Sequence, residues 1–466
     1  MSRSSSKNRL DAHRVGLALA SRTRSAAGIY DDAPALRALV RDAMVQAGLG
    51  ERDPKAPLAD IVPEGGSVLL KPNWVLHKNN SGAGMDCMVT HPEFILAALG
   101  EVLAAGAGRV IIADAPIQSA QFDVLAPPAW RERVAELGGS TPVEILDFRD
   151  TVVTMQGRDI RPRTHLRDPE RFVRFDLGSD SLLEPISEPV GRFRNTSYNP
   201  DDMTRVQRPG VHQYLLCKEP FEVDVILNLP KLKAHAKAGV TAALKNLVGV
   251  NGDKNFLPHH SVGGSALGGD CYEGLKPFKR LAEAMLDRAN RRIGRRGYVT
   301  LMQAARLANA VHCGDLEGKW AGNDTTWRMV LDLNRILLHG DVDGSLSDEP
   351  QRRVFSLTDG IVAGDRNGPL APEPVSLGAV TFGANPAYCD AAHLALMRFA
   401  PERIPLVRGA FAPMRYAIAE GNLAKAQVRC AGTTYGLADV ARLFGVDFRP
   451  PDGWTDASSL AGEKHE

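Results

Sequence analysis

Short apolar runs alternate along this chain with segments of helical periodicity, and this alternation constrains the fold more than any other feature. Residues 67–71 form an apolar run, which is followed by a polar loop, a helical pattern and a second apolar run at 109–114. The helical pattern begins near Thr90, whose hydroxyl is expected to cap it, with Pro92 in the first turn. Such alternation predicts an α/β fold, with a mostly parallel sheet and flanking helices.

The pattern changes along the chain and suggests several segments. Residues 151–220 are less periodic and predict a peripheral β-rich insertion, whereas 272–340 have the periodicity of a helical insertion. Within the latter, the basic run 291–296 is expected to be a solvated helix end. The predicted organisation is a flexible N-terminal arm (1–11), a first α/β unit (12–150), the peripheral insertion (151–220), a motif-bearing α/β segment (221–271), the helical insertion (272–340), a C-terminal α/β unit (341–450) and a flexible tail (451–466).

Composition excludes several classes of protein. A net charge of +1 gives no basic surface for nucleic acid. The sequence contains no run of about 18 apolar residues and no signal-peptide pattern, so we expect a cytoplasmic protein without a membrane partner. The six cysteines are scattered and form no C-x-x-C pair, which predicts reduced thiols and no iron–sulfur cluster. Nothing in the sequence sets the oligomeric state.

The segment 228–235 directly follows an apolar run. Lys231, Lys233 and His235 alternate in it, so an extended chain places them on one face. Several cationic groups on one face are costly unless an anion meets them, and a carboxylate or phosphate ligand fits, as does a metal held through His235. An edge strand protected by lysines against aggregation is the alternative.

The residues that follow favour a functional site. Gly239 and Thr241 stand where a helix is expected to start, and the free N–H groups of a helix start favour an anion. Further polar residues then come in quick succession: Lys245, Asn246, Asn251, His259 and His260. A helix with a glycine stop and a solvated turn is the alternative, but this density of basic groups favours functional use.

Two other segments end apolar runs. After the first run, Lys71 offers charge, Asn73 an amide and Trp74 an apolar wall, in a position where open α/β sheets bind ligands. A tryptophan in the core is the alternative for Trp74. In the glycine-rich segment 358–368, Asp359 and Asp365 suit Mg²⁺ coordination or the fixing of a lysine from across the site.

Two more acids, Asp114 and Asp390, end or follow apolar runs and suit either a hydrogen-bond anchor or a metal ligand. The sequence contains no P-loop, no G-x-G-x-x-G after a first strand and no G-x-S-x-G elbow, which disfavours P-loop kinases, Rossmann dehydrogenases and α/β-hydrolases.

These segments together resemble a bacterial and archaeal family, the domain of unknown function 362. The matching residues, from about 65 to 395, are KPNW (71–74), THPE (90–93), ADA (113–115), NLPKLKAH (228–235), GVTAALKNLVG (239–249), DGIVAGD (359–365) and GPL (368–370). Some members carry an added ferredoxin-like domain, whose cysteines this chain lacks. The family is also distantly similar to the N-terminal region of nickel-pincer lactate racemases. That resemblance implies cofactor roles for Lys231, Lys233, His235 and Lys245, and an acid–base role for His259 or His260.

The leading hypothesis is an enzyme that acts on an anionic small molecule, either a carboxylate or a phosphorylated metabolite. His235, Lys245 and Lys231 are the catalytic candidates, and Asp359, Asp365 and Asp114 are the candidates for a divalent cation such as Mg²⁺. Candidate substrate-binding residues are Lys71, Asn73, Trp74, Lys233, Gly239, Thr241, Asn246 and Asn251, with His259, His260 and Asp390 as further site residues. Group transfer and isomerisation are both open. The alternatives are a non-catalytic anion-binding or assembly protein and a nickel-pincer-like racemase.

Overall fold

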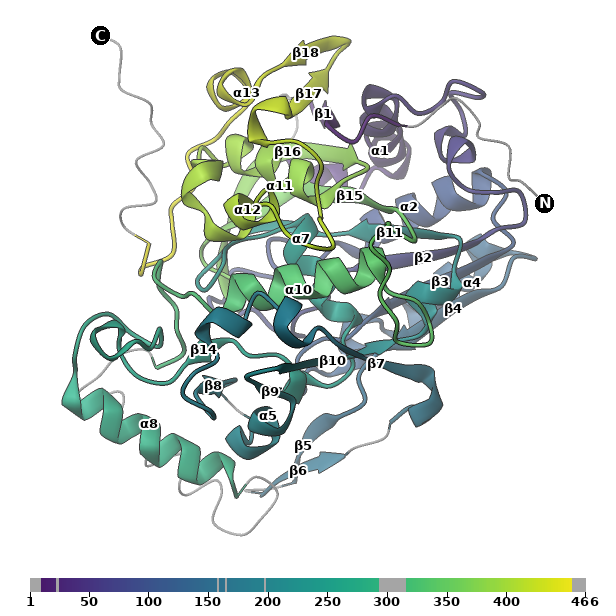
Figure 1. The fold of residues 1–466 in the computed structure, drawn as a ribbon. Helices are drawn as coiled ribbons and strands as arrows, with labels where there is room; N and C mark the ends of the chain where they lie inside the picture. The colour runs from purple at the N-terminus through teal and green to yellow at the C-terminus, as the bar shows by residue number, and fades with distance from the viewer. Residues whose placement is uncertain are drawn as a thin grey trace, which may run out of the picture.

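The structure is a computed structural model that describes residues 10–21, 25–156, 159–163, 166–196, 198–292 and 316–454. Its centre is a large sheet flanked by helices (Figure 1). In chain order the strands of its main path are β1 (Arg14–Leu19), β2 (Ser67–Pro72), β3 (Arg109–Asp114), β4 (Val143–Asp147), β11 (Val225–Leu229), β15 (Val354–Asn367), β16 (Ala371–Gly383), β17 (Gln427–Cys430) and β18 (Thr433–Tyr435).

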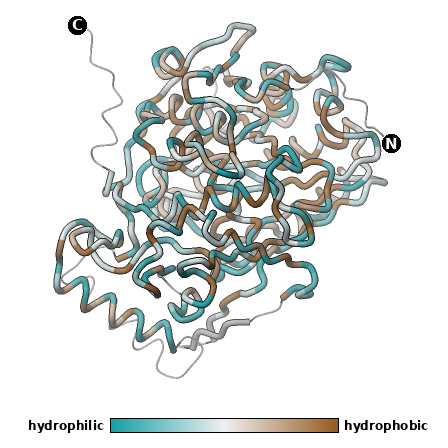
Figure 2. The backbone as a smooth tube through the Cα atoms, in the orientation of Figure 1, coloured by the Kyte–Doolittle hydropathy of each residue, from teal (hydrophilic) through white to brown (hydrophobic). Residues whose placement is uncertain are grey.

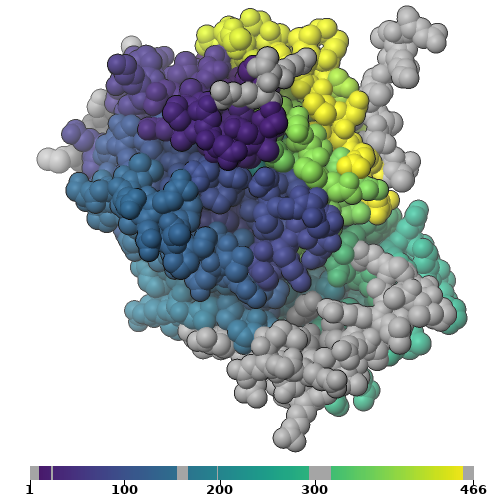
Figure 3. All heavy atoms as spheres, turned by 180° about the vertical axis from the view of Figure 1, so that it is seen from behind, coloured from purple at the N-terminus to yellow at the C-terminus, as the bar shows by residue number. Residues whose placement is uncertain are grey.

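The central sheet is mostly parallel, as predicted. Its spatial order is β18-β17-β1-β16-β15-β11-β2-β3-β4, and the pairs from β15 to β4 are all parallel. Antiparallel pairing joins β15 to β16 and β16 to β1. Because β1 also pairs with β17, the first strand of the chain lies among the last ones, and the purple and yellow regions adjoin in Figure 3.

Helices cover both faces of the sheet. Along β2, Leu69 belongs to one hydrophobic cluster while Val68 and Leu70 belong to the other, as the alternation of side chains in a strand requires. Hydrophobic segments accordingly concentrate in the middle of the molecule (Figure 2). The cluster with Val68 and Leu70 includes α1 (Ala33–Ala47), α2 (Pro92–Ala104), α3 (Phe122–Leu125) and α4 (Pro128–Gly138); the other includes α7 (Ala243–Asn246), α10 (Thr326–His339), α11 (Pro386–Leu396), α12 (Pro405–Ala410) and α13 (Leu437–Leu443).

The predicted cap of α2 is wrong by one residue. The side chain of His91, not that of Thr90, accepts the N–H of Glu93 at 3.2 Å, while Pro92 is in the first turn as predicted. Thr90 instead uses its hydroxyl to join two strand ends, since it donates to the carbonyl of Leu229 at 2.6 Å and accepts the N–H of Asn73 at 2.8 Å.

Two glycine-bearing segments differ from the sequence-based prediction. Gly239 does not begin a helix, because β12 (Lys231–His235) and β13 (Gly239–Thr241) form an antiparallel hairpin and α7 begins only at Ala243. Gly239 has a φ of +81° at the start of β13, a conformation that favours glycine. Residues 358–367 are not a loop either, since they continue β15, which pairs with β12.

The two predicted insertions carry small elements around the sheet. Residues 151–220 contain short antiparallel sheets, made of β5 (Val152–Gln156) with β6 (Asp159–Arg163), and of β7 (Phe172–Asp176), β9 (Gln207–Arg208) and β10 (Val211–Cys217). The same residues contain α5 (Pro200–Val206), and α6 (Glu219–Glu222) lies at their end. Within them, β8 (Phe193–Arg194) pairs with β14 (His260–Ser261), which comes later in the chain. In 272–340, α8 (Pro277–Asn290) lies at the periphery (Figure 1), whereas α10 is buried in the core.

Parts of several predictions fall outside the described residues, namely most of the N-terminal arm and of the tail, and residues 293–315 with most of the basic run. Among the described residues, Cys87, Cys217, Cys271, Cys389 and Cys430 are free and buried, and Cys313 lies outside them. In this described part of the chain, each helix is too short or too polar to cross a lipid bilayer.

Candidate functional site

Asn246 joins the predicted motifs into one site. At the end of α7, its Nδ2 donates to the carbonyl of Lys71 at 3.1 Å and to Oδ1 of Asn228 at 2.7 Å. Its Oδ1 accepts from Nδ2 of Asn73 at 2.9 Å. Nζ of Lys233 in turn donates to Oδ1 of Asn73 at 2.7 Å. The loop after β2 and the β12–α7 segment therefore lie together at one edge of the sheet.

Asp390 fixes the start of α7. Its carboxylate accepts the backbone N–H groups of Ala243 at 2.7 Å and Leu244 at 3.0 Å, and it lies 3.0 Å from Nδ1 of His393. Backbone N–H groups at a helix start lack partners within the helix, so an acceptor here holds the turn that carries Lys245 and Asn246. Of its two predicted roles, Asp390 has that of an anchor.

Lys71 is neutralised by a neighbouring strand. Its Nζ lies 2.7 Å from Oδ1 of Asp114, whose Oδ2 accepts the N–H of Trp74 at 2.7 Å. Gly249 packs against this pair so closely that a Cβ there would lie 1.8 Å from Oδ1 of Asp114. The ring of Trp74 packs edge-to-face against Phe122 in the core. Lys71 and Asp114 thus brace the site, and Trp74 is a core residue rather than a wall for ligand.

Lys231 is neutralised in the same way. Its Nζ lies 2.6 Å from Oδ2 of Asp359, and both side chains are fully buried. The hydroxyl of Tyr30 donates to Oδ1 of Asp359 at 2.6 Å. Burial lowers the pKa of Lys231, and the carboxylate of Asp359 opposes that shift. Asp359 therefore fixes a lysine, which was one of its two predicted roles.

Asp365 lies on a different part of β15 and holds the C-terminal segment. Its carboxylate accepts from Nε of Arg449 at 2.7 Å and from Nη2 at 2.9 Å. Arg449 precedes Trp454, which is buried and donates from its indole nitrogen to the carbonyl of Ala236 at 2.7 Å. Each of the three predicted metal-binding aspartates therefore already has a cationic partner. Among the described residues, no group of three or more His, Cys, Asp or Glu side chains is arranged to hold a metal ion.

Among the described residues, Lys233, Lys245 and Lys254 have no carboxylate at ion-pair distance. Within the described ranges, Nζ of Lys233 donates to two neutral oxygens, those of Asn73 and Met88. Nζ of Lys254 donates to the carbonyl of Asn251 at 3.1 Å. Lys245 has no hydrogen-bond or ion-pair partner in the part of the chain that the structure describes. We use the name cationic cluster for the group formed by Lys233, His235, Lys237, Lys245, Lys254 and His259, whose protonated forms repel their neighbours in the group.

Burial and mutual repulsion shift the ionisation of these lysines. Burial, with repulsion from Lys231 and Lys245, lowers the pKa of Lys233 to about 7. Burial, with repulsion from Lys254, Lys237 and Lys71, lowers the pKa of Lys245 to about 7. Burial likewise lowers the pKa of Lys254 to about 8. At neutral pH these amines are therefore divided between charged and neutral forms, so they can bind an anion or accept a proton.

The two histidines of the cluster have complementary hydrogen-bonding states. Nδ1 of His235 accepts the backbone N–H groups of Lys237 at 3.0 Å and Ala238 at 3.1 Å, which leaves the proton of the neutral ring on Nε2. Nδ1 of His259 faces the carbonyl of Leu257 at 2.8 Å and so carries the proton, which leaves a lone pair on Nε2. Burial and nearby lysines place the pKa of both rings well below its usual value. His235 therefore offers a donor and His259 an acceptor.

The cluster has a buried side and a partly exposed side. Lys237, Lys245 and His259 are partly exposed, whereas Lys233, His235 and Lys254 are buried. Thr241 lies directly opposite Lys233 in the β12–β13 hairpin, so both side chains lie on the same face. The Thr241 hydroxyl is buried and has no hydrogen-bond partner among the residues that the structure describes. A ligand that enters beside Lys245 would supply the missing partners.

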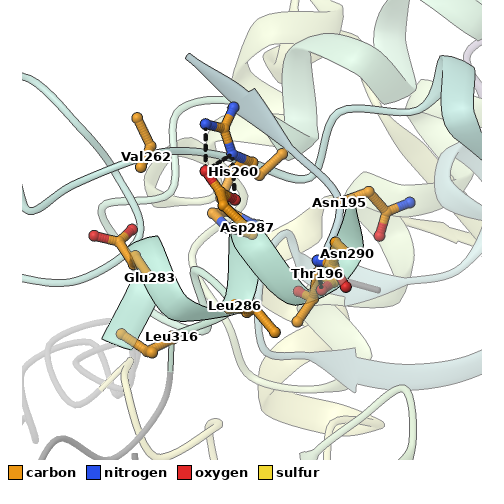
Figure 4. Close-up of a pocket in the computed structure, with 10 residues that line it drawn as sticks. Asn195, Thr196, His260, Val262, Glu283, Leu286, Asp287, Asn290 and Leu316 are labelled. Carbon is orange, nitrogen blue, oxygen red and sulfur yellow. Dashed lines mark hydrogen bonds and ion pairs between the residues drawn. The ribbon is translucent and has the colours of Figure 1, made fainter. Parts of the chain in front are cut away.

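His260 does not belong to this cluster. It lines a separate small pocket against α8, together with Thr196 and Asn290 (Figure 4). Nδ1 of His260, Oγ1 of Thr196 and Oδ1 of Asn290 are buried there, and they have no hydrogen-bond partner in the described part of the chain. Beside them, the guanidinium of Arg194 and the carboxylate of Asp287 form an ion pair at 2.7 Å. His259 and His260 thus diverge, because successive side chains in an extended segment point to opposite sides.

Sequence reasoning assigned no role to several residues of the site. Lys254 sits in the polar turn for which solvent exposure was one of two interpretations, and it is buried. Its Nζ donates to the carbonyl of Asn251, whose Oδ1 accepts the N–H of Leu215 at 3.0 Å. The sequence signal for Lys254 was its closeness to the other basic residues, since it lies five residues after Gly249, the expected stop of the helix that carries Lys245. Tyr30 and Arg449 reach the site from distant parts of the chain, and no local pattern marks them.

Comparison with known proteins agrees with the motifs. The family model described as domain of unknown function (DUF362) matches residues 68–172 and 178–395. The chain is 25% identical over 197 residues to the thylakoid-associated protein sll1697 of Synechocystis sp., a match that covers 42% of this chain and 43% of that protein. A crystal structure of a protein from Thermotoga maritima overlaps 73% of this chain and 53% of that one, with 10% identity and a TM-score of 0.33. Since the family model covers more than half of its length, this chain belongs to the family described as domain of unknown function 362.

Proposed function

We propose that this protein is an enzyme that binds an anionic small molecule, a carboxylate or a phosphorylated metabolite, at the cationic cluster and transfers protons there. One observation carries the proposal: Lys245 lies among Lys254, Lys237 and Lys71 with no acidic partner among the described residues. Lysines crowded in this way are costly to the fold unless an anion offsets their charge. Such arrangements are common where ligands bind.

The chemistry follows from the protonation states of the cluster. Lys233 and Lys245 in their charged forms bind the anion. Nε2 of His259, or the neutral amine of Lys245, accepts a proton from the bound molecule. The Nε2–H group of His235 donates a hydrogen bond to an oxygen that gains negative charge. Lys231, a catalytic candidate on the sequence alone, instead holds β12 through Asp359.

Thermal unfolding tests the binding half of the proposal. Phosphate or citrate should raise the melting temperature of the wild-type protein, because a ligand at a hundredfold excess over Kd stabilises the fold by about 2.7 kcal/mol. Chloride at equal ionic strength controls for screening. Lys245→Met should remove most of the rise, whereas the exposed Lys55→Met should retain it. Equal shifts with all three salts would refute the anion site.

Proton transfer is tested separately. The protein is incubated in D₂O with panels of carboxylates and phosphorylated metabolites, and ¹H and ³¹P NMR follow the exchange of carbon-bound protons and the appearance of products. We expect exchange or turnover with some members of the panel, and its loss in His259→Asn with binding preserved. Binding without exchange or product across the panel would instead favour a non-catalytic anion-binding protein.

A further inference from the structure

We infer that the ligand of the cationic cluster carries at least two negative charges close together, as a phosphate monoester or a dicarboxylate does. This inference rests on the proposed function and specifies the class of molecule bound. It follows from the charges that remain without a counter-ion and from the kinds of hydrogen-bonding groups that line the cluster.

The charge balance of the site sorts its lysines into two classes. Lys71 and Asp114 cancel each other, as do Lys231 and Asp359, because each pair is buried at direct ion-pair distance. Three buried or partly buried lysines remain: Lys233, Lys245 and Lys254. Asp114 attracts Lys233 and Lys254 from further away, but its two oxygens are already bound to Lys71 and to the N–H of Trp74. Asp253 also attracts its neighbour Lys254. A bound anion favours the protonated form of all three amines, and a ligand with a single charge would then leave most of their positive charge without a counter-ion.

The charged neighbours of Lys245 also favour a ligand with more than one negative charge. The charged groups that influence it are Lys254, Lys237 and, least of the three, Lys71, whose charge is offset by Asp114. Around Lys233, the repelling groups include Lys231 and Lys245. Lys245 is thus the member on which repulsion converges, and it is also partly exposed, so it marks the place where the charge of a ligand is most strongly favoured.

The hydrogen-bonding groups point to a ligand rich in acceptor oxygens. Ammonium groups only donate, Nε2 of His235 carries a proton, and the hydroxyl of Thr241 is free to donate. The acceptor assigned to the cluster is Nε2 of His259. A doubly charged phosphoryl group or a pair of carboxylates presents several acceptor oxygens to such a donor-rich lining, and charge-assisted bonds of this kind are the strong ones.

The test compares ligands that differ in charge but little in shape. Titration calorimetry with the full chain at pH 7.5 would use methyl phosphate against dimethyl phosphate, and succinate against its monomethyl ester. We expect the doubly charged member of at least one pair to bind roughly tenfold more tightly or better, as the loss of one charge-assisted contact implies. The pair that binds distinguishes a phosphate ester from a dicarboxylate.

The outcomes separate this inference from the proposed function. Equal affinity of the two members in both pairs would overturn the two-charge inference while leaving an anion site in place. If none of the four compounds binds, the anion site itself is refuted. In the pair of compounds that binds, Lys245→Met should reduce the ratio between the affinities of the doubly and the singly charged member. Lys55→Met should leave this ratio unchanged. If Lys245→Met fails to fold, the comparison on the wild-type protein still decides.

Discussion

Nζ of Lys231 lies 2.6 Å from Oδ2 of Asp359 in a pair of side chains with no solvent exposure. Lys233 is equally buried two residues further along the same strand, yet in the described part of the molecule its Nζ contacts just the neutral oxygens of Asn73 and Met88. Neighbouring lysines on one strand thus have different physical roles. The first completes the fold, and the second is left with charge for a ligand.

Removal of Lys231 should therefore damage the fold itself. Lys231→Met leaves Asp359 charged and buried with only hydrogen bonds from Tyr30 and backbone, which costs about 3–5 kcal/mol of unfolding free energy. The double variant with Asp359→Asn should recover part of that loss, because it removes the unpaired charge. Urea unfolding of both variants measures the effect. A change in Lys231→Met no larger than in Lys55→Met would contradict the assigned role.

Removal of Lys245 should have the opposite effect in the absence of ligand. Methionine is similar in length and carries no charge, so Lys245→Met relieves the repulsion from Lys254 and Lys237. Because Lys245 is partly exposed, we expect a gain of only about 1 kcal/mol in unfolding free energy. The measurement uses urea unfolding in a buffer without multivalent anions. A clear loss of stability would show that Lys245 has a structural partner and would remove the main support for the anion site.

The sequence predicted the mostly parallel sheet correctly. Apolar runs such as those at β2 and β3 are buried on both sides, and the parallel order follows from the helices between them. Because the carboxyl ends of parallel strands share one edge, Asn73 and Asn246 could be expected to lie together despite their distance in sequence.

Pairing between side chains could not be predicted in the same way. Lys231 and Lys233 are both lysines on the same face of β12. Only the fold shows that Asp359 pairs with Lys231 and not with Lys233. Likewise, Gly239 is compatible with a helix start or a hairpin, and pairing of β12 with β13 decided the outcome. Arg449, whose guanidinium binds the carboxylate of Asp365, lies 84 positions away in the sequence. The sequence alone therefore did not show this pairing, and Asp365 was predicted as a metal ligand.

The stability of the ligand-free protein should depend on the cluster lysines between about pH 7 and about pH 10. Lys245 has a pKa of about 7 in the fold against the ordinary 10.5, so it costs the most stability below pH 7, where it is charged in both states. As pH rises above 7, the unfolded chain binds more protons than the folded one, and this cost fades. The stability difference between Lys245→Met and wild type should therefore shrink across this range.

The pH experiment follows unfolding free energy from urea titrations at several pH values, with Lys55→Met as the matched control. That variant should track the wild type throughout, since Lys55 is exposed. A constant difference between Lys245→Met and wild type from neutral to alkaline pH would mean that Lys245 keeps its ordinary pKa. Binding of phosphate should weaken over the same interval, because the amine that binds it loses its proton.

Gly249 packs directly against the buried ion pair of Lys71 and Asp114, so a side chain at this position should disturb that pair. A Cβ at this position would lie 1.8 Å from Oδ1 of Asp114 and 2.6 Å from Nζ of Lys71, so Gly249→Ala must push apart a buried ion pair. Overpacking of this kind costs about 1–3 kcal/mol, and separation of the charges adds to it. Gly436→Ala is the matched control, since a Cβ there meets nothing within 4 Å. Thermal unfolding should therefore show a large drop in melting temperature for Gly249→Ala alone. Equal melting of the two variants would mean that the Lys71–Asp114 pair is not held as described.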